Sequence, residues 1–242
     1  MISSNLDEVR RRITAAAQRA HRNPGDIRLI AVSKTFPAED VIAAAAAGQH
    51  DFGENRVQEA LPKIDATRGL PAEASAKAGP LDWHLIGHLQ SNKARKAAAS
   101  FTWIHSIDSV DLLQKIDAAA ADAGTSPRVL IQVDLAHEST KSGADAADVP
   151  VIARAALAGR AVQLSGLMIV PPIADNPEDA RPWFRQLREL RDQLVASGMP
   201  AAALSELSMG MSHDFEVAIE EGATMVRVGS AIFGHRDYPA QA

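Results

Sequence analysis

The sequence of 242 residues contains no cysteine, a single tyrosine and only 4% aromatic residues. Without cysteine, the chain can form neither disulfides nor thiolate metal sites. The formal net charge of −5 gives no excess of basic residues, so we expect no binding to nucleic acid or to anionic lipid. No apolar run approaches the length of a membrane span, and charges interrupt the N-terminus where a signal peptide needs an apolar core. These absences predict a soluble, cytoplasmic protein.

Short apolar runs alternate with helical patterns along almost the whole chain. An amphipathic pattern first predicts a leading helix over residues 2–20. Strands are then predicted at residues 28–33, 50–52, 82–86, 102–105, 128–133, 162–168, 206–209 and 225–228. Helices are predicted between them at residues 39–47, 55–64, 92–99, 110–121, 150–158, 177–197 and 213–220. Such an alternation is typical of parallel βα units.

Parallel βα units are compatible with a closed (β/α)8 barrel or with a doubly wound open sheet. A barrel takes about 250 residues, so one TIM-type barrel would use the whole chain. The strand count favours the barrel, and no G-x-G-x-x-G motif follows the first strand, as a dinucleotide-binding sheet would have. No domain boundary is evident. We therefore predict one domain over residues 1–242, with a surface loop at the Ala-, Gly- and Pro-rich residues 66–80.

The predicted strands end in polar residues, and in a barrel these ends form the mouth where ligands bind. The first strand, LIAVSKTFP, ends in Lys34, whose ammonium must reach water, find a counter-ion or lose its proton. Taken alone, a lysine pointing into solvent is the simpler interpretation. Other strand ends bring further polar residues to the same mouth: Asn55, His84, His88, Asp108, Asp134, Ser212 and Arg227.

The last two strands are followed by segments that suit a phosphate group. Ser212 precedes a predicted helix and is expected to cap its N-terminus. Gly229 turns the chain, and Ser230 begins a helical turn whose free backbone N–H groups and dipole favour an anion. Barrels frequently bind phosphate with the loops after their seventh and eighth strands. A tight turn that needs glycine explains Gly229 equally well from the motif alone.

Two other groups of polar residues resemble a zinc site and a hydrolase triad, but neither fits the pattern that such a site requires. His84 and His88 are separated by four positions, but neither an H-E-x-x-H motif nor a thiolate accompanies them, so we predict no zinc site. Ser212, His213 and Asp214 are consecutive and cannot align their side chains as a hydrolase triad.

A lysine on one side of the mouth and a phosphate site on the other suggest a phosphorylated aldehyde held as a Schiff base. Pyridoxal 5′-phosphate (PLP) fits this description, and Arg227 is placed to face its ring nitrogen. A permanently charged guanidinium there would discourage protonation of that nitrogen. The alternative role for Arg227 is a salt bridge with a nearby carboxylate. A Schiff base forms through the neutral amine, and the apolar strand behind Lys34 together with Arg227 would favour loss of its proton.

Eight segments between residues 29 and 236 resemble the pyridoxal phosphate homeostasis protein family, relatives of the barrel domain of bacterial alanine racemase. They are AVSKTFP, FGENRVQE, WHLIGHLQSNKAR, HSIDS, ESTKSG, GLM, LSMGMSHDFEVAI and VRVGSAIFGHR. The resemblance implies a barrel like the alanine racemase N-terminal domain, with PLP as its cofactor. The cofactor-binding residues that it implies are Lys34 as the Schiff-base former, Arg227 at the pyridine nitrogen, Asn55 in the cofactor shell, and Ser212, Gly229 and Ser230 at the phosphate.

The sequence departs from the family pattern at several positions. Asp134 stands where asparagine is usual, and its charge near the mouth could lower affinity for anionic ligands. Ser230 stands where threonine is frequent but keeps the hydroxyl, His235 replaces a small residue, and the 66–80 loop is longer than usual. Lys141 matches a family lysine and either relays the cofactor or is a solvated loop residue.

Members of this family bind PLP without an established reaction and are implicated in vitamin B6 and amino-acid homeostasis. The resemblance therefore implies a non-catalytic PLP carrier that buffers the cofactor or delivers it to PLP-dependent apo-enzymes, and we expect it to be a monomer. The first alternative is a racemase-like enzyme. Racemases of the related fold need a second acid/base group, which is a tyrosine from another domain, whereas the only tyrosine of this chain is Tyr238. The second is a phosphosugar-binding barrel enzyme that uses Lys34, but obvious paired carboxylates around the lysine are lacking.

Overall fold

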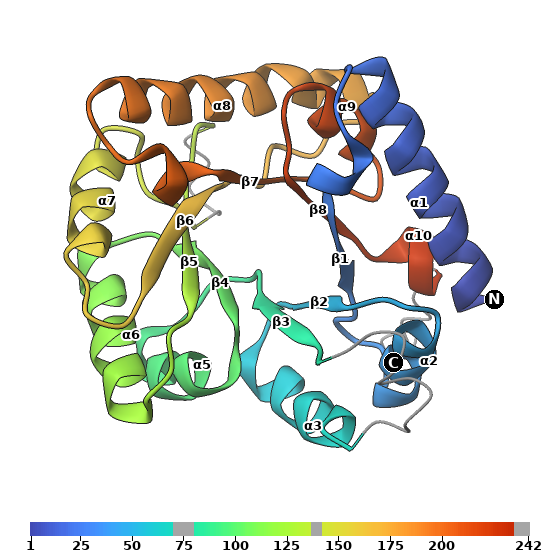
Figure 1. Ribbon diagram of the computed structural model, residues 1–242, viewed down its shortest axis with the longest axis horizontal. Coiled ribbons are helices and arrows are strands. Elements are labelled where there is room, and N and C mark those ends of the chain that lie inside the picture. Colours follow the sequence, from blue (N-terminus) through green and yellow to red (C-terminus); the bar gives the residue numbers. More distant parts are fainter. Residues whose placement is uncertain (70–79, 137–141, 235–242) are drawn as a thin grey trace, which may run out of the picture.

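Eight parallel strands close into a barrel in the order of the sequence (Figure 1). The computed structural model describes residues 1–69, 80–136 and 142–234. The strands are β1 (Arg28–Val32), β2 (Asp51–Glu54), β3 (Asp82–Leu85), β4 (Trp103–Ile107), β5 (Arg128–Gln132), β6 (Gln163–Met168), β7 (Glu206–Met211) and β8 (Met225–Val228). β8 pairs with β1 in the register Arg28 to Met225, which closes the sheet. The predicted barrel is confirmed, and the open sheet is excluded.

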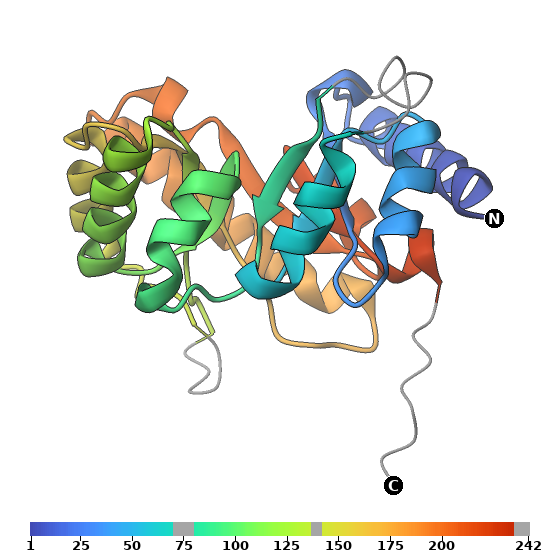
Figure 2. The same cartoon turned by 90° about the horizontal axis from the view of Figure 1, so that it is seen from below.

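Helices surround the strands, as the side view of Figure 2 shows. They are α1 (Ile2–Arg19), α2 (Ala38–Ala46), α3 (Val57–Thr67), α5 (Ala94–Ser100), α6 (Val110–Ala123), α7 (Val149–Leu157), α8 (Arg181–Ala196), α9 (Phe215–Glu220) and α10 (Ser230–Phe233). Short 3-10 helices are η1 (Pro24–Asp26), η2 (Ser91–Lys93), η3 (Pro177–Ala180) and η4 (Ala201–Leu204). α3 continues through Thr67 into the start of the predicted 66–80 loop, and residues 70–79 of that loop lie outside the described ranges.

Local signals explain where the helices begin and end. The Ser109 hydroxyl accepts the Leu112 N–H at 3.3 Å and caps the start of α6. Gly124 ends the same helix in the left-handed region, with φ of 65°. None of the helices in the described ranges is both long and apolar enough to cross a membrane.

The predicted leading helix α1 lies outside the barrel beside α9 and α10 (Figure 1). Its apolar stripe, which includes Leu6, Val9 and Ile13, is buried. On the same helix, Arg12 and Arg19 form ion pairs with Glu216 of α9 at 2.7 and 3.1 Å. Apolar packing and ion pairs together fix α1 against the final βα units.

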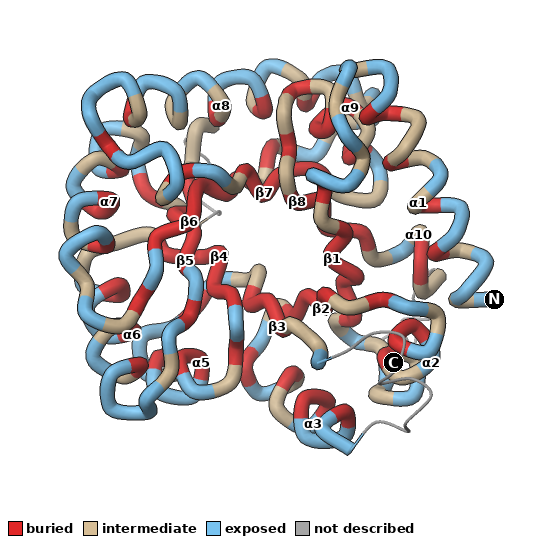
Figure 3. The backbone as a smooth tube through the Cα atoms, viewed as in Figure 1, coloured by how far each residue is buried: buried red, intermediate tan, exposed pale blue. Residues whose placement is uncertain are grey.

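The core consists of an apolar layer between strands and helices and a smaller group of side chains inside the barrel. Figure 3 shows buried residues along the strands and exposed residues on the outer turns of the helices. Inside the barrel, the apolar group comprises Ile30, Trp103, Leu130, Met168 and Met225. Polar side chains also lie inside the barrel, among them His84, His105 and Ser208.

Candidate functional site

A cavity of about 560 Å³ lies at the C-terminal ends of the strands. Every cofactor-binding residue predicted from the sequence lines it: Lys34, Asn55, Ser212, Arg227, Gly229 and Ser230. Its other lining residues are Val32, Phe36, Ile86, Val170, Met211, His213 and Gly234. The cavity therefore combines a lysine, an arginine and hydroxyl groups with apolar side chains that suit a flat ring.

Lys34 follows β1 on a turn that a buried polar cluster holds in place. Lys63 Nζ donates to the Ser33 carbonyl oxygen and to Glu54 Oε1, each at 2.7 Å. The Ser33 hydroxyl donates to the same Glu54 oxygen at 2.7 Å. Burial raises the pKa of Glu54, while the hydrogen bonds from Lys63 and Ser33 oppose that shift. The backbone next to Lys34 is thereby fixed, and Thr35 adopts a φ of 70°, a costly conformation for a β-branched residue.

Arg227 lies on β8 and is only 4% exposed. Its Nη1 donates to Ser208 Oγ at 2.7 Å, and its Nη2 donates to the Ile169 carbonyl oxygen at 2.8 Å. Among the described residues it forms no ion pair, so hydrogen bonds take the place of the alternative salt bridge. Burial lowers the pKa of Arg227 to about 10, partly offset by the charge of Asp214, so it is a cation at neutral pH.

The ends of β7 and β8 meet through Ser212 and Gly229. Ser212 Oγ accepts the Gly229 N–H at 3.1 Å, which leaves the hydroxyl proton to be donated elsewhere. A Cβ on Gly229 would lie 3.2 Å from the Val32 carbonyl oxygen, so a side chain there would crowd β1. Ser230 is the first residue of α10. These residues form a compact set of polar groups on one wall of the cavity.

The prediction that Ser212 caps the following helix is wrong. β7 runs on to Met211, and α9 begins only at Phe215, after Asp214. The Asp214 carboxylate accepts the Met211 N–H at 2.6 Å and holds the intervening turn. Ser212 is consequently free of the helix and bonds to the backbone of Gly229 across the mouth.

Asn55 is placed by a close approach of two strand ends. It follows β2, and Gly87 follows β3 beside it. A Cβ on Gly87 would lie 2.4 Å from the Asn55 carbonyl oxygen, so only glycine allows this contact. The close packing directs the Asn55 segment to the cavity wall.

The prediction that His84 lies at the mouth is wrong. Its side chain is fully buried inside the barrel, where Nε2 contacts Asp51 Oδ1 at 3.0 Å. His88 lies apart from His84, at the surface: its Nδ1 is 3.7 Å from Asp108 Oδ2, and its side chain is 53% exposed. The His84 side chain faces the interior but reaches Asp51, the first residue of β2, so it lies towards the end of the barrel opposite the mouth.

Two further polar residues predicted near the mouth, Asp108 and Asp134, do not line the cavity. The Asp134 carboxylate accepts the Ala136 N–H at 3.2 Å and so stabilises its own turn after β5. Lys141 and His235 lie outside the described residues. Sequence reasoning missed Phe36, Ile86 and Val170, whose apolar character alone predicts only burial.

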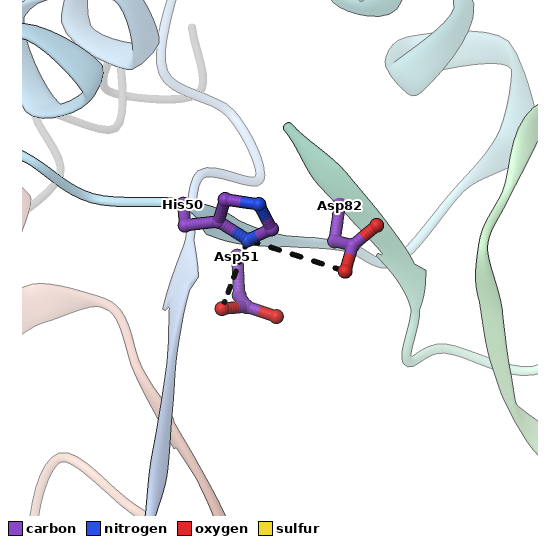
Figure 4. A group of neighbouring side chains, drawn as sticks. All are labelled: His50, Asp51 and Asp82. Carbon is purple, nitrogen blue, oxygen red and sulfur yellow. Dashed lines mark ion pairs between the residues drawn. The ribbon is translucent and has the colours of Figure 1, made fainter. Parts of the chain in front are cut away.

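At the start of β2 and β3, His50, Asp51 and Asp82 bring their side chains together (Figure 4). His50 Nδ1 lies 3.4 Å from Asp51 Oδ2 and 4.0 Å from Asp82 Oδ2. The guanidinium of Arg28 already contacts both carboxylates, at 2.6 and 3.9 Å. Because the Arg28 cation already pairs with both carboxylates, the group is better described as an ion-pair cluster than as a metal site.

Comparison with known proteins identifies the family. Residues 4–237 match the family described as alanine racemase, N-terminal domain. The pyridoxal phosphate homeostasis protein of Pseudomonas aeruginosa is 43% identical over 242 residues, which cover 100% of this chain and 98% of that protein. The corresponding protein of Aquifex aeolicus is 42% identical over 233 residues, covering 96% and 97%.

Solved structures show the same relationship. PipY of Synechococcus elongatus PCC7942, solved without PLP, is 40% identical with a TM-score of 0.84, covering 97% of this chain and 100% of that one. The PipY structure with PLP bound gives a TM-score of 0.82 at the same identity and coverage. Alanine racemase of Clostridium difficile 630 shares the fold alone, at 16% identity and a TM-score of 0.70, over 98% of this chain and 57% of that one. The chain thus belongs to the pyridoxal phosphate homeostasis protein family.

Proposed function

We propose that this protein binds PLP in the mouth cavity and holds it there as a reversible Schiff base on Lys34. The observation that carries the proposal is that a lysine, a buried cationic arginine and the Ser212–Gly229 pair line one cavity of about 560 Å³. PipY, a relative at 40% identity, has a structure with PLP bound. The family membership and the cavity chemistry therefore point to the same ligand.

The donor groups of the cavity suit each part of PLP. Ser212 and Ser230 can donate hydroxyl protons to the phosphate dianion, beside the backbone of Gly229. Apolar surface for the ring comes from Val32, Ile86, Val170 and Met211. PLP itself supplies an aldehyde that amines capture reversibly. Arg227 remains charged at neutral pH, so it would face the ring nitrogen as a donor and disfavour its protonation.

Capture of the aldehyde needs only the neutral amine of Lys34, and its release needs only water. The nitrogen of the neutral amine adds to the aldehyde carbon, a C=N bond forms, and the aldehyde oxygen leaves as water with both amine protons. Hydrolysis reverses these changes and frees the cofactor. A reversible bond of this kind suits a protein that limits the free aldehyde and releases it to other proteins.

The role that we propose is that of a non-catalytic, monomeric carrier that buffers PLP or delivers it to PLP-dependent apo-enzymes. Racemisation needs an acid/base group on each face of the substrate. Within the described ranges, the ionisable side chains lining the cavity are Lys34, His213 and Arg227. His213 Nε2 is engaged with the Asp175 carbonyl oxygen at 2.9 Å, and Arg227 is a fixed cation. A carrier needs neither of them to exchange protons.

Delivery can be tested with a PLP-dependent enzyme stripped of its cofactor. The PLP-loaded protein should restore activity to this apo-enzyme, whereas a sample first reduced with borohydride should not, because reduction makes the C–N bond permanent. The Lys34→Ala variant, loaded and desalted in parallel, is the matched control and should transfer much less. Equal transfer from the reduced and unreduced samples would refute the proposal.

A further inference from the structure

A continuous row of buried hydrogen bonds crosses the barrel interior and ends at Arg227. Arg227 Nη1 donates to Ser208 Oγ at 2.7 Å, and Ser208 Oγ lies 2.9 Å from His105 Nδ1. His105 Nε2 lies 2.9 Å from His84 Nδ1, and His84 Nε2 lies 3.0 Å from Asp51 Oδ1. We call these five residues the interior relay. It draws on β8, β7, β4, β3 and β2, and Arg227 is its one member that is also a predicted contact of PLP.

With both histidines neutral, the partners leave only one arrangement of protons along the interior relay. Asp51 contributes a carboxylate, because hydrogen bonds from His84 and Arg28 outweigh burial and lower its pKa. His84 Nε2 must therefore carry a proton to donate to it, and a neutral His84 then has a bare Nδ1. That nitrogen can only accept from His105 Nε2–H, so His105 Nδ1 is also bare and accepts the hydroxyl proton of Ser208. Every hydrogen bond then runs from the guanidinium towards the carboxylate.

Burial supports the neutral state of both histidines. Burial lowers the pKa of His84, and it lowers that of His105 well below the ordinary value, with the charge of Arg227 adding to the effect at His105. Arg28 binds the far end of the relay, contacting Asp51 Oδ1 at 2.6 Å. The Asp51 carboxylate therefore lies between two cations: Arg28 contacts it directly, and Arg227 is linked to it through Ser208, His105 and His84. A fully satisfied buried network of this kind is rigid.

We propose that Ser208 and His105 are positioning residues that hold the Arg227 guanidinium facing the cavity as a fully protonated donor. The reason is that Ser208 gives its own proton to His105, so its oxygen is left as an acceptor for Arg227 Nη1. The Ile169 carbonyl oxygen fixes Nη2 at 2.8 Å, and the two contacts together set the plane of the guanidinium. The inference rests on the proposed function in one respect: the group that Arg227 meets in the cavity is an unprotonated pyridine nitrogen.

The first test uses the wild-type protein without PLP. Nitrogen-15 NMR should find His84 and His105 neutral with the proton on Nε2, and it should resolve separate Nη1 and Nη2 signals for Arg227 because rotation of the guanidinium is hindered. A proton on Nδ1 of His105 would overturn the proposal, because His105 would then donate to the Ser208 oxygen and compete with Arg227 for it instead of accepting the serine proton. This measurement needs neither a variant nor a ligand.

The second test compares two serine-to-alanine variants. Ser208→Ala removes a member of the interior relay, whereas Ser106→Ala removes a hydroxyl that is equally buried, on the strand of His105, and has no hydrogen-bond partner among the described residues. Ser208→Ala should merge the Nη signals of Arg227, shift the nitrogen-15 signal of the PLP ring nitrogen, and weaken PLP binding by about tenfold. Ser106→Ala should change none of these.

Two results would separate this inference from the proposed function. Equal Arg227 signals and equal PLP affinity in the two variants would overturn the positioning role, even if PLP binds normally. Failure of the wild-type chain to bind PLP would overturn the proposed function, while the histidine tautomers would still decide the order of protons in the interior relay. If Ser208→Ala fails to fold, the wild-type NMR measurement decides alone.

Discussion

Replacing Ser212 with alanine removes one hydroxyl where the ends of β7 and β8 meet. In the structure this hydroxyl accepts the Gly229 N–H at 3.1 Å, and its proton can be donated to a phosphate. A hydrogen bond to a charged group contributes about 1.5–3 kcal/mol. Because about 1.4 kcal/mol corresponds to a factor of ten in affinity, Ser212→Ala should weaken PLP binding by about ten to one hundred times.

The assay is an absorption titration of each protein with PLP and with pyridoxal, which lacks the phosphate. Pyridoxal affinity should change little in Ser212→Ala, because the missing hydrogen bond belongs to the phosphate. Ser106→Ala, which removes a buried hydroxyl elsewhere in the barrel, should leave both affinities unchanged. Equal losses for PLP and pyridoxal would refute the reasoning and would mean that Ser212 only supports the Gly229 backbone.

Three further predictions follow from buried charges and from the carrier role. Lys63→Met leaves the Glu54 carboxylate buried without its 2.7 Å cation, so urea denaturation should show a loss of about 3–5 kcal/mol in unfolding free energy; a double variant with Glu54→Gln should recover most of it, and an undiminished loss would contradict the account. The pKa values of His84 and His105 are lowered in the folded state, so the unfolded chain takes up more protons below about pH 6.5. The stabilisation that depends on neutral histidines should be complete above that pH and should fall below it, by at most about 1.4 kcal/mol per pH unit for each histidine. Urea midpoints at several pH values test this. The midpoint should fall less steeply with pH in His105→Gln than in the wild type, and identical slopes would argue against the account. Chiral analysis after incubation with L-alanine and saturating PLP should detect no D-alanine beyond the Lys34→Ala background, whereas turnover that disappears in Lys34→Ala would favour the racemase-like alternative.

The barrel could be predicted because the alternation of apolar strand-like runs with amphipathic helical patterns follows directly from which residues are buried. Each predicted strand overlaps an observed one, and the closure of β8 on β1 follows from the number of units rather than from any single residue. The convergence of Lys34, Ser212 and Arg227 was also predictable, since parallel strands bring their carboxyl ends to the same edge of a sheet. Topology alone makes distant residues neighbours at the mouth.

The polar interior could not be predicted for a physical reason. A histidine in a strand has the same local pattern whether it points into the barrel or towards a helix, and the partners of His84 and His105 lie on other strands. Lys63 presents the same difficulty, because its helix position says nothing about Glu54, which it meets only when α3 packs near the end of β2. The cap expected at Ser212 failed because Asp214 holds the turn instead.

The central claim, that Lys34 carries the cofactor, can be tested by locating the covalent bond. The protein is incubated with PLP, reduced with borohydride and digested, and the peptides are identified by mass spectrometry. We predict one phosphopyridoxyl group on the peptide that contains Lys34, and none in Lys34→Ala, whose circular dichroism spectrum should match that of the wild type. A modification on Lys141, or an undiminished yield of adduct in Lys34→Ala, would contradict the account.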